Sequence, residues 1–252
     1  MLTQRALRTP PSQWLQSSRI AVFLPILLVL IALAGCTTTQ VRTLSSPEGV
    51  IPALDGSVVM IAPDIEVSEV IAGGVSEPRK AWTEAARRHY PEAARQRLAS
   101  QGVVLRPDFV IPIDTAPEQR LRQLELLSQA VSISILQYSG PNGHLRNKHG
   151  RFDWTLGPGV AELRQATGAD YALFTYLRDG YSSGGRVAMR VIGFLLLGGD
   201  IGGGLQVGVA SLVDLRSGQV VWHNLLIDQT GDLRTPEGAR ETAGDLLKGF
   251  PK

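Results

Sequence analysis

Apolar and polar residues recur along this chain in patterns that predict two long helices. Over residues 78–100 and 115–138, apolar side chains return every three or four positions, as on one face of an α-helix. Pro91 lies inside the first pattern and should kink that helix or split it in two. The expected buried faces consist of Trp82, Ala85, Ala86, His89, Ala93 and Leu98 in the first helix, and of Leu121, Leu124, Leu127, Val131, Ile135 and Tyr138 in the second.

Shorter apolar or alternating runs predict strands around these helices. The expected strands lie at 57–62, 65–71, 103–105 and 170–177, and a hairpin is expected over 202–215 and 219–227. A short helix is expected at 158–168, and Thr235 should cap a last helix. Helices alternate with strands early and a β-meander closes the chain. This order predicts an α/β (α+β) fold: a mixed central sheet with flanking helices and a C-terminal β-hairpin plus helix.

The apolar run at residues 20–33 indicates export rather than a membrane span. It is shorter than the roughly 20 residues that a bilayer requires, and Pro25 interrupts it. A basic leader without acids, an apolar core and small residues before a cleavage site are the three parts of a signal peptide. Leu33-Ala34-Gly35-Cys36 resembles the lipobox of bacterial lipoproteins, in which cleavage falls between Gly35 and Cys36 and the thiol carries diacylglycerol. The alternative is a plain signal peptide or a single-span anchor with an incidental cysteine.

These features divide the chain into three parts. Residues 1–35 are the lipoprotein signal peptide, 36–56 read as a flexible tether rich in Thr, Ser, Pro and Gly, and 57–252 as one periplasmic α/β domain. Cys36 is the only cysteine, so no disulfide can form within the chain. Thr37 after the cysteine, in place of Asp, implies export to the outer membrane. We therefore expect a palmitate-bearing lipid anchor at its periplasmic face.

Charge and histidine spacing exclude several classes of ligand. The net charge of +2 falls to about −1 when the signal peptide, with three arginines and no acids, is removed. No electrostatic footprint for nucleic acid remains. The four histidines share no ligand spacing, so we expect no metal and no cofactor.

One motif matches a hydrolase signature. Residues 180–184, Gly-Tyr-Ser-Ser-Gly, fit the G-x-S-x-G nucleophile elbow, and Asp200 or Asp214 followed by His223 gives the order of an α/β-hydrolase triad. An elbow must lead into a helix, whereas a glycine-rich and extended segment follows here. His223 also falls inside an expected strand. A serine/glycine loop is therefore favoured, and a serine hydrolase using Ser182 and His223 is the alternative.

The segment 186–197, RVAMRVIGFLLL, is almost continuously apolar and has glycines on both sides. It is too short to span a membrane as a helix and lacks the alternation of a half-buried strand. One interpretation is a buried core strand or short helix. The other is an apolar excursion on glycine hinges that meets a membrane or a partner protein. Its candidate contact residues are Arg186, Val191, Ile192, Phe194, Leu195, Leu196 and Leu197.

Several short motifs occur together with the lipobox: the strand at 58–62, the helix end at 98–103, Thr-Gly-Ala-Asp-Tyr-Ala-Leu at 167–173, and Val-Asp-Leu-Arg-Ser-Gly-Gln-Val-Val-Trp at 213–222. In this order they resemble the periplasmic lipoprotein class that includes the curli-secretion channel protein CsgG and the penicillin-binding-protein activator LpoB. The resemblance implies an α/β domain without catalytic residues that binds partners or assembles into rings. Residues 182–185 and the segment after them fall where channel-forming members carry a membrane hairpin.

The segment 186–197 departs from the channel-forming pattern, because it lacks the in-out alternation of a barrel strand. An oligomeric secretion-channel component is therefore a second alternative. The preferred hypothesis is a non-enzymatic, lipid-anchored accessory or assembly factor. Its expected partners are periplasmic or outer-membrane proteins, or further copies of itself.

Overall fold

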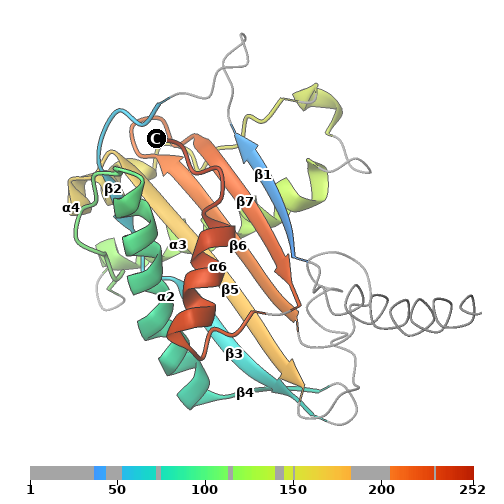
Figure 1. Ribbon diagram of the computed structural model, residues 1–252. Coiled ribbons are helices and arrows are strands. Elements are labelled where there is room, and N and C mark those ends of the chain that lie inside the picture. Colours follow the sequence, from blue (N-terminus) through green and yellow to red (C-terminus); the bar gives the residue numbers. More distant parts are fainter. Residues whose placement is uncertain are drawn as a thin grey trace, which may run out of the picture. The chain divides into compact units, whose positions relative to one another are not determined.

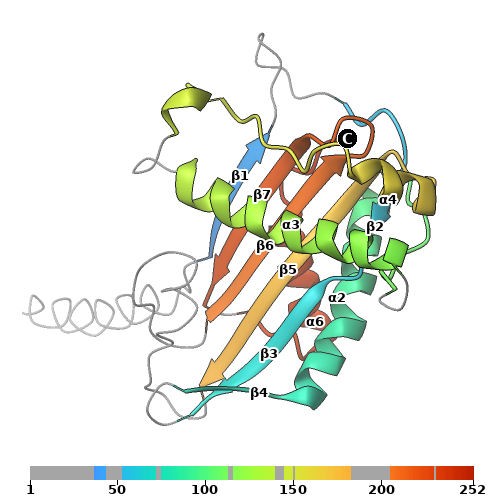
Figure 2. The ribbon, with the colours of Figure 1, turned by 180° about the vertical axis from the view of Figure 1, so that it is seen from behind.

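A computed structural model describes residues 37–43, 53–71, 75–112, 116–139, 145–149, 151–182, 205–229 and 231–252. They contain one seven-stranded mixed sheet with helices on both faces (Figures 1 and 2). The strand order is β1-β7-β6-β5-β3-β4, and β2 pairs with the first part of β5. Strand β6 pairs antiparallel with both of its neighbours, β5 and β7, whereas β2 and β3 run parallel to β5. The expected mixed sheet with flanking helices and a C-terminal hairpin plus helix is confirmed.

Most expected elements are present with shifted ends. The strands are β1 (Thr38–Thr43), β2 (Val58–Met60), β3 (Asp64–Val70), β4 (Ser76–Pro78), β5 (Tyr171–Ser182), β6 (Leu205–Asp214) and β7 (Val220–Asp228). The helices are α2 (Lys80–Ser100), α3 (Ala116–Tyr138), the 3₁₀ turn η1 (Arg146–Lys148), α4 (Val160–Thr167) and α6 (Pro236–Leu246). None of these described helices is long and apolar enough to cross a membrane.

The sheet begins earlier in the chain than the sequence indicates. The tether expected at 36–56 is wrong over Thr38–Thr43, which pairs antiparallel with β7 at six register positions. Thr is common in linkers, but the β-branched side chains of Thr and Val also suit a pleated edge strand. The Thr37 hydroxyl donates a 3.0 Å hydrogen bond to Asp228 Oδ1 and fixes the start of this strand. Residues 44–52 of the expected tether lie outside the described residues.

Helices α2 and α6 cover one face of the sheet (Figure 1). Helix α2 continues through Pro91 from Lys80 to Ser100 and is not split. Its buried residues are Ala86, Tyr90, Ala93, Ala94 and Leu98, so the inward face includes Tyr90, while Trp82, Ala85 and His89 are half-buried. These side chains form the main core with Ile65, Leu212, Trp222 and Leu246.

Helices α3 and α4 lie on the opposite face (Figure 2). Leu121, Leu124 and Ile135 are buried as expected, but Leu127 is 41% exposed and Tyr138 is 37% exposed. Buried serines Ser128 and Ser132 take part in the inward face instead. The Ser132 and Ser211 hydroxyls lie 3.0 Å apart, because two small side chains let α3 approach β6 closely. The predicted face is therefore wrong at Leu127 and Tyr138, and it omitted the two buried serines.

The expected strand at 103–105 is not a regular strand. Leu105 and Phe109 instead make isolated parallel bridges to Val58 and Ile61, beside β2. Pro107 lies between the two bridges and has no N–H to donate, so a continuous ladder cannot form there.

Candidate functional site

The features of chemical interest gather at one end of the sheet, which we call the proximal end and define by Thr38, Ser182, Leu205 and Asp228. Here β1 begins, β5 ends, β6 begins and β7 ends. Register pairs link Thr38 through β7 to Val207, two residues inside the start of β6. The proximal end is therefore shared by the strand that follows Cys36 and by the two strand ends that flank residues 183–204.

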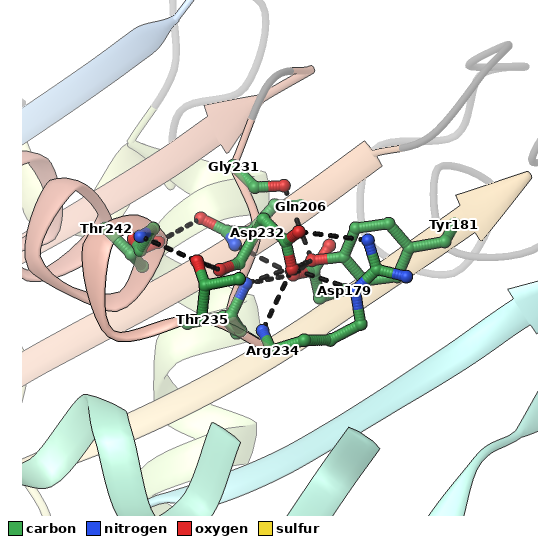
Figure 3. A network of polar contacts seen from close by, with 10 residues as sticks. Asp179, Tyr181, Gln206, Gly231, Asp232, Arg234, Thr235 and Thr242 are labelled. Carbon is green, nitrogen blue, oxygen red and sulfur yellow. Dashed lines mark hydrogen bonds and ion pairs between the residues drawn. The ribbon is translucent and has the colours of Figure 1, made fainter. Parts of the chain in front are cut away.

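A buried carboxylate is the centre of this end (Figure 3). Asp179 on β5 is only 2% exposed. Its Oδ2 accepts hydrogen bonds from the Tyr181 hydroxyl at 2.5 Å, from Gln206 Nε2 at 3.0 Å and from the Leu233 backbone N–H at 3.2 Å. Three donors from β5, β6 and the turn after β7 thus replace the water that the carboxylate loses on burial.

An ion pair lies beside this carboxylate. Arg234 donates to both carboxylate oxygens of Asp232, at 2.8 and 2.9 Å. Its guanidinium lies 3.7 Å from the Tyr181 ring centroid and 4.9 Å from that of Trp82 on α2. The Tyr181 hydroxyl is also 3.0 Å from Asp232 Oδ1, so one phenolic proton serves two carboxylates.

The network continues into α6. Gln206 Oε1 accepts a 2.8 Å hydrogen bond from the buried Thr242 hydroxyl. The Thr235 hydroxyl caps the helix, because it accepts from the Gly238 N–H at 3.1 Å. Gly238 leaves room for this turn, since a Cβ there would lie 2.1 Å from the Asp232 carbonyl oxygen. Strands β5 and β6, the turn at 231–235 and α6 are therefore held as one unit.

The charges within this network differ in their surroundings. Burial raises the pKa of Asp179 to about 6, an effect that its three hydrogen bonds only partly offset. Burial and the neighbouring Asp179 carboxylate raise the pKa of Tyr181 above its usual range. Hydrogen bonds from Arg234 hold the pKa of Asp232 below its usual range. Asp179 can thus take up a proton in mildly acidic conditions while Asp232 stays ionised.

A small cavity of about 220 Å³ borders the network and is lined by Asp179, Gly180, Tyr181, Gln206, Gln229, Gly231 and Asp232. Sequence reasoning did not identify this site. The available signal was an Asp and a Gln in strands that are otherwise apolar. Asp179 and Gln206 lie 27 residues apart, Thr242 lies 36 residues beyond Gln206, and Leu233 lies 54 residues beyond Asp179, so the pattern alone could not assemble them.

The strand register separates the residues of the expected hydrolase triad. Ser182 ends β5 opposite Val70, whereas His223 pairs with Ser211 and, through it, with Phe174. The two positions are eight residue steps apart on β5, which is about 26 Å along an extended strand. His223 is also buried within the sheet, and burial lowers its pKa to about 3. The structure therefore does not bring Ser182 and His223 together.

The third member of that triad is not supplied either. Asp214 pairs with Tyr171, further still from Ser182, and the alternative Asp200 lies outside the described residues. Residues 183–204, which would have to form the helix of a nucleophile elbow, lie outside the described residues.

Two other sets of expected site residues lie outside the described residues. They are Gly35 and Cys36 of the lipobox, and Arg186, Val191, Ile192, Phe194, Leu195, Leu196 and Leu197 of the apolar segment. The structure gives the positions of their neighbours in the chain. Thr37 and Thr38 follow the lipobox directly, and Ser182 and Leu205 flank the apolar segment at the proximal end.

No family model and no curated protein matches this chain. Among solved structures it is similar to the PelC dodecamer from Paraburkholderia phytofirmans, with 13% identity and a TM-score of 0.39, over 84% of this chain and 96% of that chain. It is also similar to the LpoB C-terminal domain from Salmonella enterica, with 16% identity and a TM-score of 0.27, over 73% of this chain and 87% of that chain.

Proposed function

We propose that this chain is a non-enzymatic, lipid-anchored envelope protein at the periplasmic face of the outer membrane. Acyl chains on Cys36 hold it there, and it acts by binding periplasmic or outer-membrane proteins. The observation that carries the proposal is the start of β1 at Thr38, only two residues after the lipobox cysteine. Two residues span at most about 7 Å, so an anchor at Cys36 places the proximal end against the lipid surface.

The strength of such an anchor depends on the number of acyl chains. Each buried CH₂ contributes about 0.8 kcal/mol, and a single chain gives only reversible binding. A diacylglyceryl cysteine with a further acyl chain on its amine anchors firmly. The short connection to β1 then also limits the orientation of the body, which a long tether would leave free.

The apolar segment 186–197 fits the same orientation. The strands on either side of it in the chain end at Ser182 and begin at Leu205, both at the proximal end. We propose that Phe194 and Leu195 to Leu197 contact this membrane surface, or a partner protein within it, while Arg186 lies nearer the anionic headgroups. Apolar side chains flanked by cations are typical of segments that lie in the membrane interface.

The polar network gives this segment a rigid base. Asp179 and Gln206 join the last part of β5 to the first part of β6, and Arg234 packs over Tyr181 at the same place. Because these strands are tied to α6 as well, both ends of the segment start from fixed positions. We infer a structural role for the network, with no reacting group assigned to it.

The anchor is tested by metabolic labelling with palmitate in a bacterial host. We expect the wild-type chain to incorporate label and Cys36→Ala to remain an unlabelled precursor of higher mass. Thr37→Ser is the matched control, because it keeps the lipobox and should label normally. Labelled Cys36→Ala protein, or a mature N-terminus elsewhere than Cys36, would refute the proposal.

Two further measurements address the alternatives. A fluorophosphonate probe that labels the wild-type chain but not Ser182→Ala would establish the serine hydrolase. Size measurement in detergent distinguishes a monomer from a ring of many copies. A large ring of defined size would favour the secretion-channel component over the accessory protein.

A further inference from the structure

A basic groove lies at the other end of β1, where the strand stops at Thr43. Its cavity volume is about 270 Å³. Three cations from separate parts of the chain line it: Arg42 on β1, Lys148 in η1 and Arg151 in the following loop. Apolar and aromatic side chains complete its wall, mainly Tyr138 at the end of α3, Leu145 and Phe152.

The charge of this groove is locally unbalanced. Residues 139–152 include Arg146, Lys148 and Arg151 but no Asp or Glu. Asp153 is the nearest acid in sequence, and it lies 2.7 Å from Lys148 Nζ and 3.7 Å from Arg151. Within the described residues Arg42 makes no ion pair. On a mature chain of about −1 net charge, this surface therefore attracts anions.

The side of the groove formed by β1 has an open edge. β1 is the last strand of the sheet, and no described strand pairs with its outer side. Val41, in the same strand, is 39% exposed. Such an edge presents unpaired N–H and C=O groups, to which an extended peptide can add as a further strand.

We propose that this groove and the β1 edge bind an acidic, extended segment of a partner protein. The partner's carboxylates pair with Arg42 and Arg151, whose planar guanidinium groups donate two parallel hydrogen bonds to the two oxygens of a carboxylate. Alternate apolar residues of the partner pack against Leu145 and Phe152, and its backbone continues the ladder of β1. Lys148 already contacts Asp153 and lies 4.4 Å from the centroid of the Trp154 ring. It therefore adds to the positive potential of the groove without contacting the partner directly.

The position of the groove agrees with a partner that approaches from the aqueous side. Arg42 is four residues beyond Thr38, which is about 13 Å along the strand from the proximal end. This inference rests on the proposed function, because it names the partner chemistry of a protein that acts by binding. It does not depend on the acyl anchor, so palmitate labelling and peptide binding can fail independently.

The test uses the full-length lipoprotein in detergent micelles and fluorescence anisotropy of a labelled peptide of alternating aspartate and valine. The variant Arg42→Gln/Arg151→Gln should lower the affinity about fivefold to tenfold, as expected for two partly exposed charge pairs. The control Arg88→Gln/Arg97→Gln removes the same charge from exposed positions of α2 and should change the affinity by less than about twofold. Peptides of alternating serine and valine, or lysine and valine, should bind weakly or not at all.

Two additional arms separate the parts of the proposal. N-methylation of the valine amides should weaken binding if the peptide extends the β1 ladder, because the methyl groups remove its donors. The proposal would be overturned if the groove variant and the control variant lost the same affinity for the acidic peptide. It would also be overturned if the peptide of serine and valine bound as tightly as the acidic peptide, or if the acidic peptide did not bind. Self-association that depends on Arg42, in place of peptide binding, would assign the groove to a second copy and overturn it as well.

Discussion

Asp179 and Gln206 are register partners on β5 and β6, and their side chains meet in a buried 3.0 Å hydrogen bond. Gln206 Nε2 is the donor, while Gln206 Oε1 accepts from Thr242 on α6. One glutamine therefore links the buried carboxylate to the helix on that face of the sheet. Both strand ends that flank the 183–204 connection depend on this link.

Gln206→Ala should destabilise the protein more than an exposed glutamine would. The change removes one donor from the buried Asp179 carboxylate and leaves the Thr242 hydroxyl without one of its acceptors. We expect a loss of about 2–4 kcal/mol in the free energy of unfolding, measured by urea denaturation. Gln137→Ala on the exposed side of α3 is the control and should cost less than about 0.5 kcal/mol. Equal losses in the two variants would show that the network contributes nothing.

The sequence predicted this region only in outline. A short apolar run predicted β5, and alternating apolar positions on either side of a turn predicted β6 and β7 as a hairpin. Tyr181 and Asp232 lie about fifty residues apart, and no local pattern indicates that a phenol and a carboxylate fifty positions away will share a proton. Such contacts depend on sheet register, which a single sequence does not specify.

Two errors of the sequence analysis have local physical causes. The stretch Thr38–Thr43 has the composition of a linker, but its β-branched residues also suit an edge strand that pairs with β7. On α3, Leu127 matched the apolar period while Ser132 did not, yet Ser132 is inside because its hydroxyl meets Ser211. A prediction that divides residues only into apolar and polar assigns a buried serine to the exposed side. The buried face that it predicts for the helix is therefore partly wrong.

Asp179 should make stability depend on pH in a direction opposite to most carboxylates. Its folded-state pKa of about 6 lies above the ordinary value of 3.8, so the folded protein binds the proton more tightly. The stabilising contribution is complete below pH 3.8 and is lost as the pH rises through about 6. The full loss is about 3 kcal/mol, at about 1.4 kcal/mol for each pKa unit.

Asp179→Asn keeps a carbonyl oxygen for the three donors and removes the titration. We expect the free energy of unfolding of the variant, measured with urea, to increase relative to that of the wild type as the pH rises from about 4 to 7. The relative increase should reach up to about 3 kcal/mol. Parallel stability curves for the two proteins would mean that Asp179 is not the titrating group. Gln206→Ala measured at the same pH values shows whether a lost donor steepens the effect.

His223 should change stability in the opposite direction over the same acidic pH range. Burial, with a smaller effect from the neighbouring Arg42, lowers its pKa from 6.5 to about 3, so the unfolded chain binds the proton more tightly. Its contribution to stability is complete above pH 6.5 and is lost as the pH falls toward 3, at up to about 1.4 kcal/mol per pH unit. Between about pH 4 and 6, the effect of His223 on stability is opposite to that of Asp179. The two effects partly cancel, so the stability of the wild type measured against pH does not reveal either one.

A leucine at this position isolates the histidine. Nε2 of His223 has no hydrogen-bond partner in the described structure, so an apolar side chain of similar size loses no bond from that atom. We expect His223→Leu to be at least as stable as the wild type at pH 7 and more stable at pH 5. A marked loss at both pH values would show that the imidazole makes a bond that matters for folding. Combination with Asp179→Asn should give a nearly flat curve over the shared range.

The apolar segment 186–197 can be located with one label. Cys36 is the only cysteine, and acylation would block its thiol, so Leu195→Cys introduces a single reactive site. An environment-sensitive fluorophore attached there, in the full-length protein reconstituted into anionic vesicles, should emit at short wavelength and be quenched by nitroxide-labelled lipids. Ser100→Cys, at the exposed end of α2, is the control and should show neither effect.

The two readouts together distinguish membrane contact from burial. Short-wavelength emission without lipid quenching would mean that position 195 is packed inside the protein, and it would contradict the membrane contact proposed here. Emission typical of water at both positions would contradict both interpretations of the segment. Quenching at position 195 alone, with both strand ends fixed at the proximal end, would mean that the acyl anchor and the segment enter the same leaflet. The body would then rest on two attachments, which allow less rotation than one.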